Sequence, residues 1–338
     1  YVSGNIIKNV KSVVVPNTNG LRGIKAACAI GIIAGDSSKK LEVISKVTNE
    51  QIEDAKKFLE KDLITVKFAD TPYIFDIIIT MYKEEHKSCV RIIDYHTNVV
   101  SIQLDDKDLY KKELIGKEKS SLKDLNILTV EKIVEFADCL DVNDVKELLD
   151  KQISCNMAIA EEGLKKNYGA TIGKILLKYS SKDVNSKAVA YAASGSDARM
   201  NGCEMPVVIN SGSGNQGITA SVPLIIYAKE LGISEDRMYR ALVVSNLVSI
   251  HIKSKIGTLS AYCGAVSAGS GVASGISYLL GGNLDSVSHT IVNALAINSG
   301  IICDGAKSSC AAKIASSVEG GLLALKMYNE GKEFYDGD

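Results

Sequence analysis

The chain has 338 residues, with 39 lysines and arginines against 40 aspartates and glutamates, and a formal net charge of −1. This length is enough for two domains and a large buried core. The balanced charge excludes a general attraction to nucleic acid or to anionic membrane surfaces, so we expect neither as a partner.

The first part of the chain, residues 1–120, reads as an α/β domain with a mostly antiparallel sheet. Its first residues read as a strand, and two stretches, 21–34 and 49–59, have the pattern of helices, the second with Asn49 as its cap. Apolar and alternating runs predict further strands. These runs are residues 13–15, 63–68, 73–82, 89–95 and 99–104.

The second part, residues 121–338, reads as an all-helical domain that follows a charged linker at 111–123. Periodic apolar positions predict its helices. These are residues 130–140, 142–166, 170–179, 184–193, 218–231 and 235–250, with Ser234 as a cap, followed by small-residue helices that include one starting near Asp285. The fold class is therefore α+β, with the most apolar, small-residue helices at the centre of the second domain.

Residues 256–283 carry no charge and are long enough to raise the alternative of a membrane span. They are rich in glycine and serine and lack sustained leucine, isoleucine and valine, which membrane insertion favours. A closely packed, buried helix pair fits better. Gly271 and Gly275 lie four residues apart, so we expect them to allow close helix approach.

A glycine-rich segment between an apolar run and a helix is the most distinctive loop. Its glycines allow backbone N–H groups to turn toward one point, and the following helix N-terminus favours an anion such as a carboxylate or phosphate. The alternative is a plain helix–helix connection. The candidate binding residues are Asn210, Ser211, Gly212, Ser213, Gly214, Asn215 and Gln216.

Two polar clusters flank this loop in the sequence. Ser196 and Arg199, with Asp197 between them, form a group expected before a helix, where the arginine could orient a substrate carboxylate. The alternative is a helix cap with a surface ion pair. His251 and Lys255 interrupt an apolar helix with charge, so they are candidates for an acid or base, and a structural histidine is the alternative.

Eight cysteines occur in a chain too large to need a disulfide scaffold, so we expect a reducing cytoplasm. Cys263, Cys303 and Cys310 lie in segments of small and aliphatic residues, where thiolates are costly unless a metal neutralises them. Three thiolates would leave one iron of an iron–sulfur cluster open to a substrate. The alternative is three buried core cysteines.

In combination and in this order, the motifs Ser196–Met200, Asn210–Ile218, His251–Gly257, Cys263-Gly264 and Cys303–Cys310 resemble the iron–sulfur serine dehydratase alpha-chain superfamily. They are most similar to its L-cysteine desulfidase branch. The resemblance implies a [4Fe-4S] cluster held by the three cysteines and a substrate pocket formed by the glycine-rich loop. It also implies α,β-elimination of L-cysteine to pyruvate, ammonia and sulfide without pyridoxal phosphate.

The sequence departs from this branch at one point. Its members carry a Cys-Thr-Glu-Pro segment whose cysteine is the expected proton-transfer residue, and no such segment occurs here. We therefore expect missing terminal segments, including one beyond Gly337, and His251 or Lys255 as the first candidates for the base.

The sequence leaves two other functions open. One is L-serine dehydration by the same chemistry, and the other is a non-catalytic role as a helical scaffold or small-molecule binding protein. The expected partner is a small amino acid, and the expected assembly is a homodimer.

Overall fold

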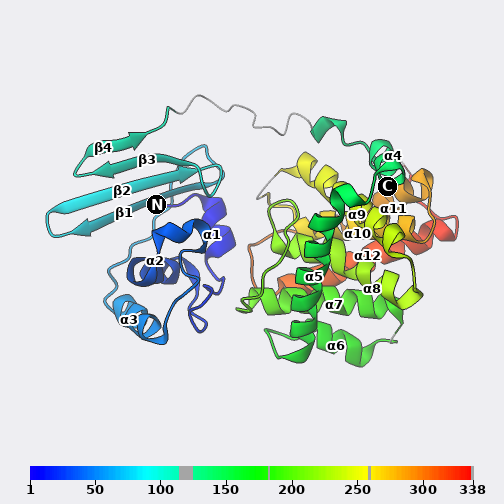
Figure 1. Cartoon of the computed structure of the whole chain (residues 1–338), viewed down its shortest axis with the longest axis horizontal. Helices are drawn as coiled ribbons and strands as arrows, with labels where there is room; N and C mark the ends of the chain where they lie inside the picture. The colour runs from blue at the N-terminus through cyan, green and yellow to red at the C-terminus, as the bar shows by residue number, and fades with distance from the viewer. Residues whose placement is uncertain (114–124, 182, 258–259, 336–338) are drawn as a thin grey trace. The chain divides into compact units, whose positions relative to one another are not determined.

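The computed structural model describes residues 1–113, 125–181, 183–257 and 260–335. It divides into two compact units, one of Tyr1–Leu122 with Asp304–Lys307 and one of Lys123–Cys303 with Ser308–Asp338 (Figure 1). The predicted boundary at 120/121 and most of the predicted linker lie outside the described residues. The α+β class is confirmed, because one antiparallel sheet accompanies a large set of helices.

The first unit combines short helices with a four-stranded antiparallel sheet of order β1-β2-β3-β4. Its elements are α1 (Gly4–Val10), α2 (Gly23–Ala34), the 3-10 helix η1 (Ser37–Glu42), α3 (Asn49–Glu60), β1 (Asp76–Lys83), β2 (His86–Ile93), β3 (Val99–Leu104) and β4 (Lys107–Lys111). A buried ion pair anchors the sheet. The Arg91 guanidinium donates to both carboxylate oxygens of Asp76, at 3.1 and 2.7 Å, and Asp76 is fully buried.

Several predictions for this unit were wrong in detail. Residues 13–15 and 63–68 form only isolated bridges, at Val14 and Phe68, and β4 was not predicted. The N-terminal residues do pair with the sheet, since Tyr1 exchanges backbone hydrogen bonds with Ile78, but the chain then turns into α1. These short apolar runs do not distinguish a strand from a loop that packs against one, because pairing partners decide the outcome.

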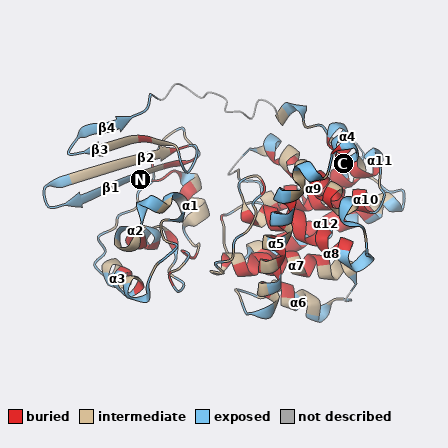
Figure 2. Ribbon diagram, in the orientation of Figure 1, coloured by how far each residue is buried: buried red, intermediate tan, exposed pale blue. Residues whose placement is uncertain are grey.

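Helices and loops make up the described residues of the second unit. The helices are α4 (Val130–Cys139), α5 (Asn143–Lys165), α6 (Ile172–Tyr179), α7 (Val184–Met200), α8 (Gly214–Leu231), α9 (Glu235–Ile256), α10 (Gly264–Leu279), α11 (Leu284–Asn298) and α12 (Cys310–Asn329). Its buried residues form one extended core that dominates Figure 2.

The small residues of α10 allow the predicted close packing at the centre of this unit. A side chain at Gly271 would clash with Ser249 and Ser245 of α9, and one at Gly275 would meet Leu224 of α8. α10 therefore touches its neighbours backbone to backbone. No helix in the described residues is long and apolar enough to cross a membrane.

Two helices run further than the sequence predicted, which changes the setting of candidate residues. α7 continues to Met200, so Ser196 and Arg199 lie within its last two turns rather than before a helix. α9 continues to Ile256, so His251 and Lys255 lie within the helix rather than at a break. Lysine near a helix C-terminus is favoured by the helix dipole, so this charge supports the helix instead of ending it. Gly257, with a φ of 80°, follows the last helical residue.

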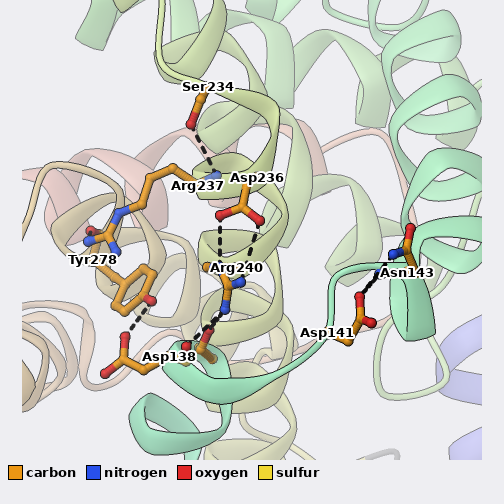
Figure 3. A network of polar contacts seen from close by, with 9 residues as sticks. Asp138, Asp141, Asn143, Ser234, Asp236, Arg237, Arg240 and Tyr278 are labelled. Atoms are coloured by element: carbon orange, nitrogen blue, oxygen red, sulfur yellow. Dashed lines mark hydrogen bonds and ion pairs between the residues drawn. The ribbon is translucent and has the colours of Figure 1, made fainter.

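A polar network joins α4 to α9 and α10 (Figure 3). The Arg240 guanidinium donates to the carbonyls of Ala137 and Asp138 at 2.8 and 3.0 Å, which caps the C-terminal end of α4. The Tyr278 hydroxyl donates to the Asp138 carboxylate at 2.6 Å. Arg237 lies over the Tyr278 ring and donates to its backbone carbonyl. This end of the unit therefore holds its polar groups in satisfied hydrogen bonds.

Candidate functional site

Backbone pairing places two of the three candidate cysteines side by side. Tyr262 and Ile302 form an antiparallel bridge, although forty residues separate their segments. The Cys263 amide donates to the Ile301 carbonyl at 3.1 Å, and the Cys303 amide donates to the Ala261 carbonyl at 2.6 Å. The short bridge fixes the register of the two cysteines, and their thiols interact directly.

The third cysteine lies in the same neighbourhood. The pKa of the Cys263 thiol is raised, first by its hydrogen bond with Cys303, then by burial and by the charges that Cys303 and Cys310 would carry as thiolates. Cys310 is the first residue of α12, and Cys263 is the N-cap of α10. Deprotonating all three thiols together is therefore unfavourable without a compensating positive charge.

Within the described ranges, no three histidine, cysteine, aspartate or glutamate side chains are arranged to hold a single metal ion. Three thiolates that bind a [4Fe-4S] cluster occupy three different irons, so they stand further apart than ligands around one ion. Cys263 and Cys303, whose thiols interact, and the nearby Cys310 supply the three sulfur donors that such a cluster needs.

The glycine-rich loop begins with a tight turn. Asn210 and Ser213 exchange backbone hydrogen bonds of 3.1 and 3.0 Å, and the two residues between them, Ser211 and Gly212, have φ angles of 48° and 77°. Both central residues thus adopt the left-handed conformation of a type I′ turn, which glycine tolerates without strain. The turn leads directly into the first residue of α8.

Buried amide groups hold the entrance of this loop. The Asn210 side chain donates to the Asn246 side-chain oxygen at 2.9 Å, and Asn246 exchanges hydrogen bonds with Gln152. The Val208 amide donates to the Asn156 side-chain oxygen at 2.9 Å, and the Asn156 Nδ2 donates to the Val208 carbonyl at 3.2 Å. Of the predicted binding residues, Asn210 therefore has an established structural partner within the protein.

Arg199 connects the loop to the third cysteine. Its Nη1 donates to the Asn215 side-chain oxygen at 3.3 Å, and a side chain at Gly214 would clash with its guanidinium. Burial lowers the pKa of Arg199, and the neighbouring Cys310 thiolate opposes this shift. A half-buried guanidinium therefore lies between the start of α8 and the start of α12.

Gln216 connects the loop to the first cysteine. Its side chain fills the space over Gly264, where an added Cβ would lie 2.9 Å from the Gln216 Oε1. Gln216 is 6% exposed, and its Oε1 is buried with no hydrogen-bond partner among the residues that the structure describes. A buried acceptor left without a donor is uncommon in folded proteins and indicates a place where a ligand or water can donate.

These contacts bring three helix N-termini together, those of α8, α10 and α12. Each N-terminus has N–H groups without partners inside its own helix and carries a partial positive charge. With Arg199 they form a positive, largely apolar region around the cysteines. Such a region can stabilise thiolates and a substrate carboxylate together.

Ser196 and Asp197 lie deep in α7. The Asp197 Oδ2 accepts a 3.2 Å hydrogen bond from the Gly173 amide at the start of α6. Its Oδ1 and the Ser196 hydroxyl are buried and have no partner in the described part of the chain. Burial raises the pKa of Asp197 to about 6, against the lowering effect of the Gly173 and Ile172 amides. The fully buried Ser196 thus differs from the half-buried Arg199 one turn later.

The candidate acid–base residues on α9 differ in their surroundings. His251 is half-buried and its Nδ1 has no hydrogen-bond partner in the described residues, whereas Lys255 is exposed. Lys253, between them, is only 6% exposed and was not among the candidates predicted from the sequence. It continues the row of Ala241, Ser245 and Ser249 that faces α10. The spacing of four residues along α9 could have identified it.

Comparison with known proteins places the chain in a family. The family model described as serine dehydratase alpha chain matches residues 38–336. No solved structure matches the chain.

Several bacterial relatives are similar along nearly the whole chain. A UPF0597 protein of Desulfitobacterium hafniense is 56% identical over 337 residues, which cover 100% of this chain and 78% of the relative. A UPF0597 protein of Lachnoclostridium phytofermentans is 48% identical over 99% of this chain and 80% of its own length. One of Treponema denticola is 44% identical, covering 99% of this chain and 79% of its own length.

Proposed function

Because the chain belongs to the serine dehydratase alpha chain family, we propose that it eliminates the β-substituent of a small amino acid, with L-cysteine as substrate and a [4Fe-4S] cluster as cofactor. The family indicates a lyase of the dehydratase type. The observation that carries the finer proposal is the grouping of Cys263, Cys303 and Cys310 with Arg199 at three helix N-termini.

The cofactor would be held by the three cysteines. The contact between the Cys263 and Cys303 thiols favours this assignment, because bound iron would displace their protons and neutralise the repulsion between neighbouring thiolates. When bound, a cluster with one open iron supplies a Lewis acid that assists departure of the substrate's β-substituent.

The protein's own residues would bind and orient the amino acid. The Arg199 guanidinium and the N–H groups at the start of α8 are suited to a carboxylate. The unpartnered Gln216 Oε1 is suited to accept a hydrogen bond from the substrate ammonium group.

His251 remains the candidate base of the two predicted from sequence. Its Nδ1 is buried with no hydrogen-bond partner among the described residues, whereas Lys255 is exposed to solvent. A base acts when it reaches the α-proton directly or through one water. His251→Gln should therefore slow exchange of the substrate α-proton for deuterium more than Lys255→Gln does.

The cofactor assignment is tested by anaerobic reconstitution with iron and sulfide. Wild-type protein should gain broad visible absorption and about four irons per chain. Replacing Cys263, Cys303 or Cys310 with serine, one at a time, should abolish or strongly reduce both signals. Cys139→Ser is the matched control, because Cys139 is exposed on α4 and should leave both unchanged. A wild-type protein that stays colourless would contradict the assignment.

L-Serine is the second candidate substrate, favoured by the description of the matching family. The two amino acids differ in the leaving group, and a thiolate suits iron better than hydroxide does. Titration of the reconstituted protein with each, followed by its visible and EPR spectra, ranks their binding. Sulfide release from L-cysteine supports the proposal, whereas pyruvate from L-serine alone supports the second candidate. A spectrum that responds to neither supports a non-catalytic relative.

The proposal includes a homodimer in a reducing compartment, since cluster thiols must remain reduced to bind iron. Light scattering coupled to size-exclusion chromatography measures the mass. A mass of one chain would remove the homodimer from the proposal without affecting the cluster assignment.

A further inference from the structure

A hydrogen-bonded asparagine links the end of α7 to the segment that precedes Cys310. Asn201 is the C-cap residue of α7, and its Oδ1 accepts a 2.6 Å hydrogen bond from the Ser308 hydroxyl. The two residues are 107 positions apart in the sequence. Ser308 lies two residues before Cys310, the first residue of α12.

The other half of the Asn201 amide is also engaged. Its Nδ2 donates to the Asp197 carbonyl, one turn back in α7, at 2.7 Å. Gly169, whose φ is 54°, packs against the same amide so closely that a Cβ there would clash with it. The amide is therefore held on two sides and presents its oxygen to Ser308 in one orientation.

The start of α12 depends on such outside contacts. Its N-cap residue, Ser309, makes no side-chain capping hydrogen bond. On the side of Cys303, Lys313 donates to the Ile302 carbonyl at 3.0 Å. On the side of α7, the Ser308 hydroxyl is hydrogen-bonded to Asn201, which directly follows the last turn of α7, where Arg199 lies.

We propose that Asn201 is a positioning residue that holds Ser308, and through it the first turn of α12, so that Cys310 stays beside Arg199 and Cys263. Its purpose rests on the proposed function, because placing Cys310 matters for holding a cluster. The mechanical part does not, because the hydrogen bonds join protein groups alone. Neither Asn201 nor Ser308 needs to touch the substrate.

The amide is chemically suited to this task because it offers a donor and an acceptor at once. Asn201→Ala removes the hydrogen bonds to Ser308 and to the Asp197 carbonyl. Ser308→Ala removes only the bond between Ser308 and Asn201. Ser308→Thr keeps a hydroxyl at this position and should retain that bond. Ser309→Ala is the matched control, since Ser309 is adjacent, exposed and without a side-chain cap bond.

The test measures alkylation of Cys310 in reduced, metal-free protein by peptide mass spectrometry, with the exposed Cys139 as internal reference. Asn201→Ala and Ser308→Ala should each raise the rate at Cys310 about fivefold, the factor that a net hydrogen bond of ordinary strength represents. The double variant should react no faster than the faster single variant. Ser308→Thr and Ser309→Ala should react like wild type.

Additive effects of the two alanine substitutions, or wild-type rates in both, would overturn the proposal. Circular dichroism and urea unfolding show whether each variant keeps its fold, and the mild Ser308→Ala variant gives the result if Asn201→Ala does not.

In reconstituted protein, the alanine variants should lose visible absorption to an iron chelator several-fold faster than Ser309→Ala does. A wild-type protein that never binds a cluster would defeat the proposed function, while the alkylation rates would still decide the role of Asn201.

Discussion

The polar groups at the two ends of the helical unit differ in how they are paired. At the α4 end, Arg240 donates to the carbonyls of Ala137 and Asp138 and to the Asp236 carboxylate (Figure 3). At the cysteine end, Gln216 Oε1 and the hydroxyl of Ser267, in the first turn of α10, are buried and have no partner within the described ranges. One end is built for stability, and the other retains capacity for a ligand.

This contrast is informative because an unsatisfied buried polar atom costs roughly 1–3 kcal/mol. The unpartnered Gln216 Oε1 lies in the first turn of α8, against the first residue of α10, which is where a bound anion or cluster would use it. The following predictions test the contrast, from the largest expected effect to the smallest.

Gly214→Val should have the largest effect. The new side chain would clash with the Arg199 guanidinium and with Val207, so the arginine must leave its place between the loop and Cys310. Losing a charged partner of a substrate carboxylate should weaken binding about a hundredfold. The measurement is titration of the reconstituted protein with L-cysteine, followed by its visible spectrum.

Gly232→Asn is the matched control for this prediction. Gly232 caps the opposite end of α8 with a φ of 64°, has open space around it, and asparagine tolerates that conformation. Unchanged substrate affinity in Gly214→Val would show that the loop does not position Arg199 for binding.

Asp197→Asn should change how stability depends on pH. Burial raises the Asp197 pKa to about 6, so between about pH 4 and pH 6 the folded protein holds this proton more tightly than the unfolded chain. The wild-type carboxyl therefore lowers the free energy of unfolding as pH rises through that window, by roughly 3 kcal/mol in total. The free energy of unfolding of Asp197→Asn, relative to that of the wild type, should therefore rise as the pH is raised from 4.5 to 7.5. Urea unfolding at a series of pH values measures this difference.

Asp183→Asn supplies a control of opposite sign on the same helix. The Asp183 carboxylate caps α7, and its hydrogen bond from the Ser186 amide lowers its pKa. Its contribution is present above the unfolded pKa and is lost as pH falls, so the asparagine variant should become relatively less stable with rising pH. If both variants showed the same trend, the buried charge at Asp197 would not be the cause.

Arg240→Met should have the smallest effect, and only on stability. The substitution leaves two carbonyls of α4 without their donor, which should lower the free energy of unfolding by about 1–2 kcal/mol. Iron content and the visible spectrum after reconstitution should not change. Asp236→Asn, which removes only an exposed ion pair, should cost less than about 1 kcal/mol. A loss of iron in Arg240→Met would contradict the view that the α4 end serves stability alone.

The sequence alone was sufficient for features that depend on local chemistry. Helix α8 after the glycine-rich turn, the Ser234 cap of α9 and the close packing at Gly271 follow from residues near one another in the chain. Such features are local because capping, turn conformation and periodic burial involve neighbours within a few residues. Strands were harder to predict, since β4 and the loops at Val14 and Phe68 depend on distant pairing partners.

The sequence singled out the three cysteines by composition and resemblance, but their arrangement came from tertiary contacts. The bridge between Tyr262 and Ile302 aligns Cys263 with Cys303, and the helix N-termini meet because of contacts such as that of Gln216 with Gly264. The bond from Ser308 to Asn201 was likewise invisible in the sequence. Residue types determine which chemistry is available, whereas long-range packing decides which groups meet, because contacts between distant segments leave no periodic trace along the chain.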